Sequence, residues 1–343
     1  MATALILVLC ACSGEPTVTD APPTPPPTRN PSPSTTIDPT LSNPAPTPTA
    51  ADVQSALDIT SLREHLEAVQ RIADDHTGNR ATGTPGFDAS ATYVTERLRS
   101  SGYVIDAQRF VGGTNLIAER VGASSGVVMI GAHLDSVRAG PGINDNGSGV
   151  AALLTIAETL ATLPPPEQTI RFAFWDAEEG GPFGSTAYVD TLPRAERDRI
   201  RAYLNLDMIG SPNAIRLVYA ETAAAAGSDA ITRQFAAYFD SVGLRWSPID
   251  LEGESDHGPF IGVGIPTGGL FSGGIEPVTD DEAERFGAVA GSLADACSHQ
   301  ACDTLANVDL ASLEEMTRAV AHVLVSLATD TMDAALLQHG TRS

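Results

Sequence analysis

Residues 131–149, GAHLDSVRAGPGINDNGSG, combine residue types that can bind metal ions. His133 and Asp145 stand twelve positions apart in this glycine-rich stretch, which follows the apolar run 127–130 and precedes a helix-like run at 150–160. A strand, a long loop and a helix in this order are typical of open α/β sheets, which bind ligands outside the carboxyl ends of their strands. We therefore interpret this loop as the first half of a two-metal site.

Ionisable residues follow three of the predicted strands. They are His133 and Asp135 after the first, Glu178 and Glu179 after the second, and Asp207 after the third. Asp145 lies in the first loop, and His299 lies in a late segment that contains two cysteines. Two divalent ions about 3.5–4 Å apart need one carboxylate to bridge them. Mixed nitrogen and oxygen ligands suit zinc best, with manganese or cobalt as alternatives. Because Glu178 and Glu179 are adjacent, they point in different directions, so one can bind metal while the other acts as a base.

Each of these features is ordinary on its own. A His-x-Asp after a strand is more often structural than metal-binding, and a pair of glutamates usually lies on a solvated surface. An aspartate at a strand end commonly caps a helix. The combination, in this order along one chain, favours a metal site.

The predicted elements around these residues alternate between strands and helices. Apolar runs and period-2 patterns predict strands at 103–110, 115–120, 127–133, 169–175, 203–206, 215–219 and 265–270. Helical spacing predicts helices at 61–75, 87–101, 150–160, 231–242 and 310–327, one over 184–201 broken at Pro193, and a short one opening at 255. A capping-box pattern at 61–64 marks the first helix, and 276–303 reads as irregular. This alternation predicts one three-layer, doubly wound α/β domain, with a mainly parallel, mixed sheet and helices on both faces.

Charge and composition limit the partners. The net charge is −23 and the pI is about 4.5, so nucleic acid and anionic membrane surfaces repel the chain. We expect no nucleic-acid partner, and a monomer.

The N-terminal region reads as an export signal and a tether. Residues 1–14 contain an apolar run too short to span a membrane, and LCAC at 9–12 resembles a bacterial lipobox with Cys12 as the lipidated residue. An ordinary secretory signal is the alternative. Both predict an exported protein, and only the lipobox predicts contact with a membrane, through the lipid on Cys12. Residues 15–51 are rich in Pro and Thr, which predicts a disordered linker. The folded domain is expected at 52–330, followed by a tail at 331–343.

Two further cysteines, Cys297 and Cys302, lie five positions apart. In an exported protein this spacing favours a local disulfide over two free thiols.

Six ordered motifs resemble those of the M28 family, the di-zinc aminopeptidases of the Streptomyces and Vibrio type. The motifs are GAHLDS at 131–136, GINDNGSG at 142–149, WDAEE at 175–179, NLDMIG at 205–210, SDH at 255–257 and HQACD at 299–303. The resemblance covers roughly residues 60–328. It implies a zinc-dependent exopeptidase that removes the N-terminal residue of peptides or proteins with a water activated by two metals.

The resemblance also implies a role for each site residue. His133 and Asp207 are expected to hold one zinc ion and Glu179 and His299 the other, with Asp145 bridging the two. Glu178 is expected to act as the general base, and Asp135 to orient the His133 imidazole from behind. A Cys297–Cys302 disulfide is expected to position His299. The peptide bond after Asp145 occupies a position that is often cis in this family.

Some positions define the pocket or depart from the family. His257 is not a zinc ligand in the family, so we read it as a pocket or structural residue. Phe271 is expected in the side-chain pocket, which favours apolar N-terminal residues. Ser298 stands where Streptomyces-type enzymes carry a tyrosine that stabilises the oxyanion, and Glu254 stands where they carry an arginine that contacts substrate.

Three alternative functions remain on the sequence alone. A glutaminyl cyclase-like transferase would use one zinc on a related scaffold. A carboxypeptidase or another amidohydrolase would use the same site. A non-catalytic binding module is disfavoured because all five expected ligands and the base are present.

Overall fold

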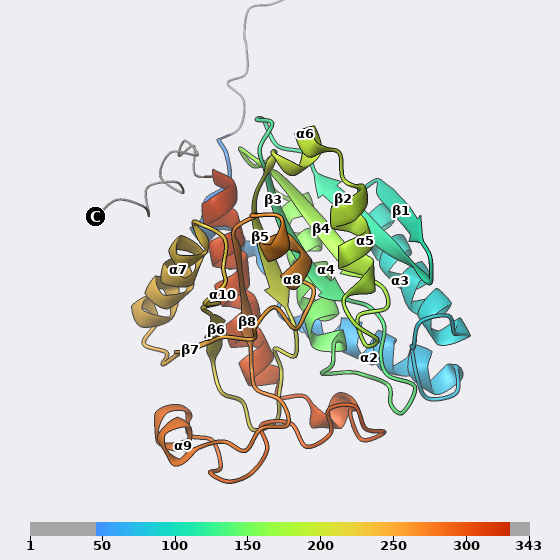
Figure 1. Ribbon diagram of the computed structural model, residues 1–343, viewed down its shortest axis with the longest axis vertical. Coiled ribbons are helices and arrows are strands. Elements are labelled where there is room, and N and C mark those ends of the chain that lie inside the picture. The colour runs from blue at the N-terminus through green and yellow to red at the C-terminus, as the bar shows by residue number, and fades with distance from the viewer. Residues whose placement is uncertain (1–45, 330–343) are drawn as a thin grey trace, which may run out of the picture. The chain divides into compact units, whose positions relative to one another are not determined.

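An eight-stranded sheet crosses the part of the chain that the computed structural model describes, residues 46–329 (Figure 1). Its strands are β1 (Ile105–Phe110), β2 (Gly113–Arg120), β3 (Val127–His133), β4 (Thr169–Trp175), β5 (Ile200–Leu206), β6 (Leu217–Tyr219), β7 (Ser247–Ile249) and β8 (Thr267–Phe271). Their order is β1-β2-β4-β3-β5-β8-β6-β7. The central pairs β4–β3, β3–β5 and β5–β8 are parallel, whereas β1–β2, β2–β4 and β6–β8 are antiparallel. The mixed, mainly parallel sheet predicted from the sequence is therefore confirmed.

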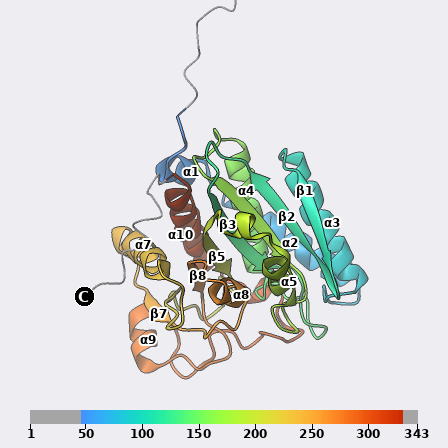
Figure 2. The same cartoon turned by 45° about the horizontal axis from the view of Figure 1, so that its top comes forward.

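Helices cover both faces of this sheet. They are α1 (Ala50–Ala56), α2 (Thr60–Asp75), α3 (Pro85–Ser100), α4 (Gly147–Ala161), α5 (Phe183–Thr191), α6 (Arg194–Arg197), α7 (Ser228–Ser241), α8 (Gly258–Gly262), α9 (Asp280–Phe286) and α10 (Leu310–Thr329), with a 3-10 turn η1 (Leu305–Asn307). The larger apolar core joins one face of the sheet to α1, α2, α3, α4, α7 and α10. A smaller core joins the other face to α5 and α8 (Figure 2). The result is the predicted three-layer arrangement.

Both faces of the neighbouring strands β3 and β4 are covered. Every residue of β3 and of β4 is buried, as expected for parallel strands packed between helix layers. Helix α4 is almost entirely buried as well. Gly149 lets its first turn approach β3, since a Cβ there would lie 2.9 Å from the Cβ of Ala132.

The crossovers explain where a site can form. The chain passes from β3 to β4 through α4 on one face, and from β4 back across β3 to β5 through α5 and α6, with α5 packed on the opposite face. The direction of winding therefore reverses beside β3. Such a switch point leaves a crevice at the carboxyl ends of the strands, where ligands bind in open α/β sheets. The segment between β8 and α10, which carries α9, lies beyond these ends (Figure 1).

Several local predictions need correction. The capping box at 61–64 is wrong: α2 begins at Thr60, and the carboxylate of Asp58 accepts the hydrogen bond from the Thr60 backbone N–H. Helix α1 begins at Ala50, inside the predicted linker. The segment 276–303 is not wholly irregular, because it contains α9, which has its own capping box between Thr279 and Glu282. The strand β7 was not predicted either.

The predicted signal and lipobox with Cys12, most of the linker, and the tail lie outside the described residues. Among residues 46–329, no helix combines the length and the apolar composition that a bilayer crossing requires.

Candidate metal centre

The expected ligands come together at the carboxyl ends of β3, β4 and β5. His133 is the last residue of β3 and pairs in register with Trp175, the last residue of β4. Asp207 directly follows β5. Asp145 lies just before α4, whose first turn is capped by the side chain of Asn146, and the Asp145–Asn146 peptide bond is cis.

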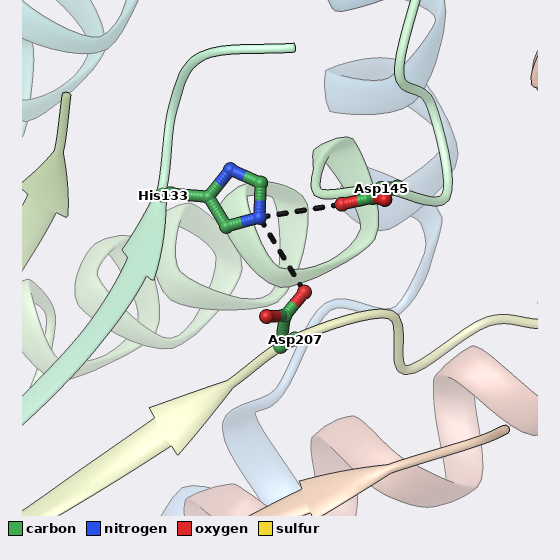
Figure 3. Close-up of side chains that lie close together, drawn as sticks. All are labelled: His133, Asp145 and Asp207. Atoms are coloured by element: carbon green, nitrogen blue, oxygen red, sulfur yellow. Dashed lines mark ion pairs between the residues drawn. The ribbon is translucent and has the colours of Figure 1, made fainter. Parts of the chain in front are cut away.

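One group of potential ligands consists of His133, Asp145 and Asp207 (Figure 3). The Nε2 atom of His133 lies 3.3 Å from Oδ1 of Asp145 and 3.4 Å from Oδ1 of Asp207. Ligand atoms of all three residues lie within 4.8 Å of one another. His133 is buried, so its imidazole faces the carboxylates rather than solvent.

A second group shares Asp145 with the first. The Nε2 atom of His299 lies 3.2 Å from Oδ2 of Asp145 and 3.1 Å from Oε2 of Glu179, and these three residues also offer ligand atoms within 4.8 Å. The two carboxylate oxygens of Asp145 thus face different imidazoles. This is the geometry that a bridging ligand needs.

The chemistry of these residues fits divalent cations. The buried Nε2 atom of His133 and the buried Oε1 atom of Glu179 have no hydrogen-bond partner, although buried polar atoms are normally paired. Burial opposes protonation of His133, but the carboxylates of Asp207 and Glu178 hold its pKa well above the ordinary value. The side chains of the candidate metal centre therefore carry an excess of negative charge, which a bound cation would offset. Neutral imidazole and carboxylate are the ligands that zinc takes at catalytic sites.

Glu178 belongs to neither group. Its Oε2 atom lies 3.9 Å from Nε2 of His133, and its side chain is 14% exposed. Burial, opposed by the nearby His133 and assisted by Asp207, raises the pKa of Glu178 to about 9. A carboxyl group with a raised pKa beside a candidate metal site suits proton transfer.

Asp135 contacts both the His133 imidazole and the turn that carries the two glutamates. The Nδ1 atom of His133 lies 3.1 Å from the backbone carbonyl oxygen of Asp135 and 3.6 Å from its carboxylate. The carboxylate accepts the backbone N–H groups of Glu178 and Glu179 at 3.1 and 3.3 Å. Asp135 therefore links the imidazole to the turn that carries both glutamates.

Two contributors were not identified from the sequence. The carboxylate of Asp303 accepts the backbone N–H groups of Asn144 and Asp145 at 2.8 and 3.0 Å. Arg80, which is fully buried, donates to backbone carbonyls of the loop between His133 and Asp145. Both act through the backbone. Asp303 ends the HQACD motif, but the motif gave no indication of these contacts.

The cysteines are paired as the sequence indicated. Cys297 and Cys302 form a disulfide with an S–S distance of 2.08 Å. His299 lies within the loop that this bond closes and has a positive φ of 59°.

A cavity of about 680 Å³ opens over the centre. Asp145, Glu178, Glu179, Asp207 and His299 all line it. Phe271, Ser298 and Glu254 line it too, as does the apolar side chain of Met208. His257 does not: it is fully buried, and its Nε2 atom lies 3.1 Å from Oε1 of Glu221. The structure therefore favours the structural role for His257 over the pocket role.

Sequence comparison agrees with this arrangement. The family described as Peptidase family M28 matches residues 115–324. The chain belongs to peptidase family M28. The matched region contains all five residues of the two ligand groups and Glu178.

Curated M28 relatives support the assignment. The chain is 40% identical over 291 residues to leupeptin-inactivating enzyme 1 of Streptomyces exfoliatus, covering 82% of this chain and 65% of that protein. It is 43% identical over 238 residues to an aminopeptidase of Pseudomonas aeruginosa (strain UCBPP-PA14), covering 67% of this chain and 44% of that protein. The chain thus spans less than two thirds of the length of these relatives.

Solved structures agree with the M28 fold. An aminopeptidase from Aneurinibacillus sp. strain AM-1 matches 83% of this chain and 99% of its own, with a TM-score of 0.66 at 16% identity, which shows the fold alone. A zinc aminopeptidase from Bacillus subtilis matches 65% of this chain and 52% of its own, with a TM-score of 0.54 at 26% identity.

Proposed function

We propose that the chain is a zinc-dependent aminopeptidase that removes the N-terminal residue from peptides or proteins. The observation that carries the proposal is the pair of ligand groups that share Asp145 within a cavity lined by Glu178. Family membership and the names of the relatives support the same activity.

Two zinc ions per chain fit the two groups. His133 and Asp207 would hold one ion, Glu179 and His299 the other, and Asp145 would bridge them. When bound, such a pair supplies Lewis acidity, which polarises the scissile carbonyl group and lowers the pKa of the attacking water.

The protein's own residues then handle the proton. Glu178 accepts it from the attacking water and returns it to the leaving amine, as a general base and then a general acid. Burial raises the pKa of Glu178 to about 9 in the metal-free protein, and the positive charge of bound zinc would lower it again, so that the carboxylate could accept the proton. Asp135 holds the backbone N–H groups of Glu178 and Glu179, so the base and one ligand keep a fixed relation to each other.

The cavity supports a preference for apolar N-terminal residues. Phe271, Met208 and Leu251 contribute apolar surface beside the carboxylates. Ser298 cannot supply the phenol that the Streptomyces-type enzymes carry at this position, and its hydroxyl oxygen lies 3.4 Å from Oδ2 of Asp145.

We also propose that the enzyme acts outside the cytosol, as a monomer, with Cys12 as a lipid anchor. The Cys297–Cys302 disulfide supports export, since such bonds persist mainly in oxidising compartments. Labelling cells with a radioactive fatty acid, with Cys12→Ala as the control, tests the anchor.

A panel of aminoacyl anilides tests the activity. The full-length protein should cleave leucine anilide, lose this activity with a chelator and regain it with zinc. N-acetyl-leucine anilide should resist cleavage, whereas a peptide with an amidated C-terminus should still lose its first residue. Cleavage of the acetylated substrate would favour an amidohydrolase, and failure on the C-terminal amide a carboxypeptidase. Release of ammonia from N-terminal glutamine, with one zinc per chain, would favour a glutaminyl cyclase.

A further inference from the structure

Arg80 is fully buried and contacts the loop that joins His133 to Asp145. Its Nε donates to the carbonyl oxygen of Pro141 at 2.9 Å and its Nη2 to that of Gly142 at 2.6 Å. Its Nη1 donates to the carbonyl oxygen of Leu134. The backbone N–H of Arg80 donates to the hydroxyl oxygen of Ser136 at 2.9 Å. All of these contacts fall between His133 and Asp145.

This loop needs an outside donor. Residues 134–146 form no helix or strand, yet most of them are buried. Buried carbonyl groups must find hydrogen-bond donors. An arginine offers five N–H groups in a rigid planar fork, so one side chain can serve three carbonyls that point in different directions. Lysine keeps the charge but carries its three donors on a single atom.

The charge of Arg80 acts at longer range than its hydrogen bonds. Among the described residues, no carboxylate lies within ion-pair distance of the guanidinium. Burial lowers the pKa of Arg80 to about 10, whereas the carboxylates of Asp135 and Asp303 act in the opposite sense. The group therefore stays charged at neutral pH. Its positive charge alone would repel a bound cation, so charge and hydrogen bonding make opposite predictions for metal affinity.

We propose that Arg80 is a positioning residue for the metal centre. It fixes the 134–142 loop so that His133 and Asp145 face each other before a metal binds. The inference rests on the proposed two-metal site. We expect the loss of hydrogen bonds to affect zinc affinity more than the loss of charge. Replacing Arg80 removes three direct hydrogen bonds to the loop, whereas its guanidinium contacts no carboxylate of the metal centre.

The test compares Arg80→Gln and Arg80→Lys with Arg171→Gln in the full chain. Arg171 is a matched control because it is also buried, on β4, where it contacts Glu119 and the hydroxyl of Tyr188 rather than the loop. Zinc affinity is measured by competition with a chromophoric chelator, and stability by thermal unfolding of the zinc-free protein. Removing groups that orient metal ligands typically lowers affinity 10–100-fold.

All three variants should unfold at a lower temperature than the wild type. Only the Arg80 variants should lose zinc affinity, by about 10–100-fold for Gln and less for Lys, and added zinc should restore their activity. Unchanged or tighter zinc binding by Arg80→Gln would overturn the proposal, as would an equal loss in Arg171→Gln.

A second variant covers the case in which the Arg80 variants do not fold. Ser136→Ala removes the hydroxyl that accepts from the Arg80 backbone and donates to the Gly140 carbonyl. It should lower zinc affinity several-fold, and unchanged affinity would count against the loop as the positioned element. The zinc content of the wild type separately tests the proposed function: a protein that binds no zinc would refute the function before any variant is compared.

Discussion

Glu178→Gln should abolish activity and also stabilise the zinc-free protein. The substitution keeps the size of the side chain and removes its ability to take a proton. General acid–base catalysis contributes about 10²–10⁴ in rate, so kcat should fall by at least about 10²-fold. Zinc content should stay at the wild-type value, because Glu178 belongs to neither ligand group.

The stability effect follows from the raised pKa. Burial, partly opposed by the nearby His133, raises the pKa of Glu178 from 4.5 to about 9. A carboxyl group with a higher pKa in the folded than in the unfolded state makes stability fall as pH rises from the unfolded-state value. Over the interval from pH 4.5 to pH 7, at about 1.4 kcal/mol per pH unit, this loss is at most about 3.5 kcal/mol. Glutamine does not ionise, so the Glu178→Gln variant should not lose stability in this way.

Two measurements check this prediction. Steady-state hydrolysis of leucine anilide gives kcat and KM, with bound zinc determined on the same samples. Chemical unfolding of the zinc-free proteins at pH 4 and pH 7 gives the stability difference, which should be small at pH 4 and favour the glutamine variant at pH 7. A variant with more than a tenth of wild-type kcat would refute the role of Glu178 as base. A glutamine variant less stable than the wild type at pH 7 would refute the electrostatic argument.

Three further predictions concern the metal ligands and the disulfide. Asp145→Ala should empty both sites, since the two carboxylate oxygens of Asp145 face different imidazoles. Glu179→Ala should leave about one zinc ion per chain, as measured by elemental analysis. Equal zinc contents in the two variants would contradict a bridging role for Asp145. Zinc affinity should rise from pH 6 to pH 9. Hydrogen bonds to Asp145 and Glu179 raise the pKa of His299 to about 10, and zinc must displace the proton of the imidazole. Calorimetry in two buffers of different ionisation enthalpy should detect the released protons. Replacing Cys297 and Cys302 together by alanine should cost about 2 kcal/mol of stability, as expected for so short a loop, and should weaken the zinc that His299 binds; unchanged zinc stoichiometry under limiting zinc would argue against that second effect.

The grouping of the candidate ligands could be predicted because parallel strands bring distant positions to one edge of the sheet. His133 and Asp207 end neighbouring strands, and the Glu178–Glu179 turn follows the strand on the other side of β3. An apolar run marked β3 and an alternating pattern marked β4, and every residue of both strands is buried. Helix α9 was missed because none of its residues is buried, so it lacks the apolar spacing by which helices are recognised. The capping-box pattern of α9 is present in the sequence, but it lies in the segment 276–303, which was predicted to be irregular.

The supporting contacts could not be predicted, because they depend on backbone atoms of residues far away in the sequence. Arg80 lies 54 residues before Leu134, whose carbonyl it binds, and Asp303 lies 158 residues after Asp145, whose N–H it binds. Asp135 lies beside His133 as expected, and its hydrogen bonds to the backbone N–H groups of Glu178 and Glu179 were not predicted. Side chains at and after the strand ends thus form the candidate ligand groups, and buried charged groups hydrogen-bond to the irregular backbone between them. Resemblance of motifs identified the candidate ligands but gave no indication of these backbone contacts.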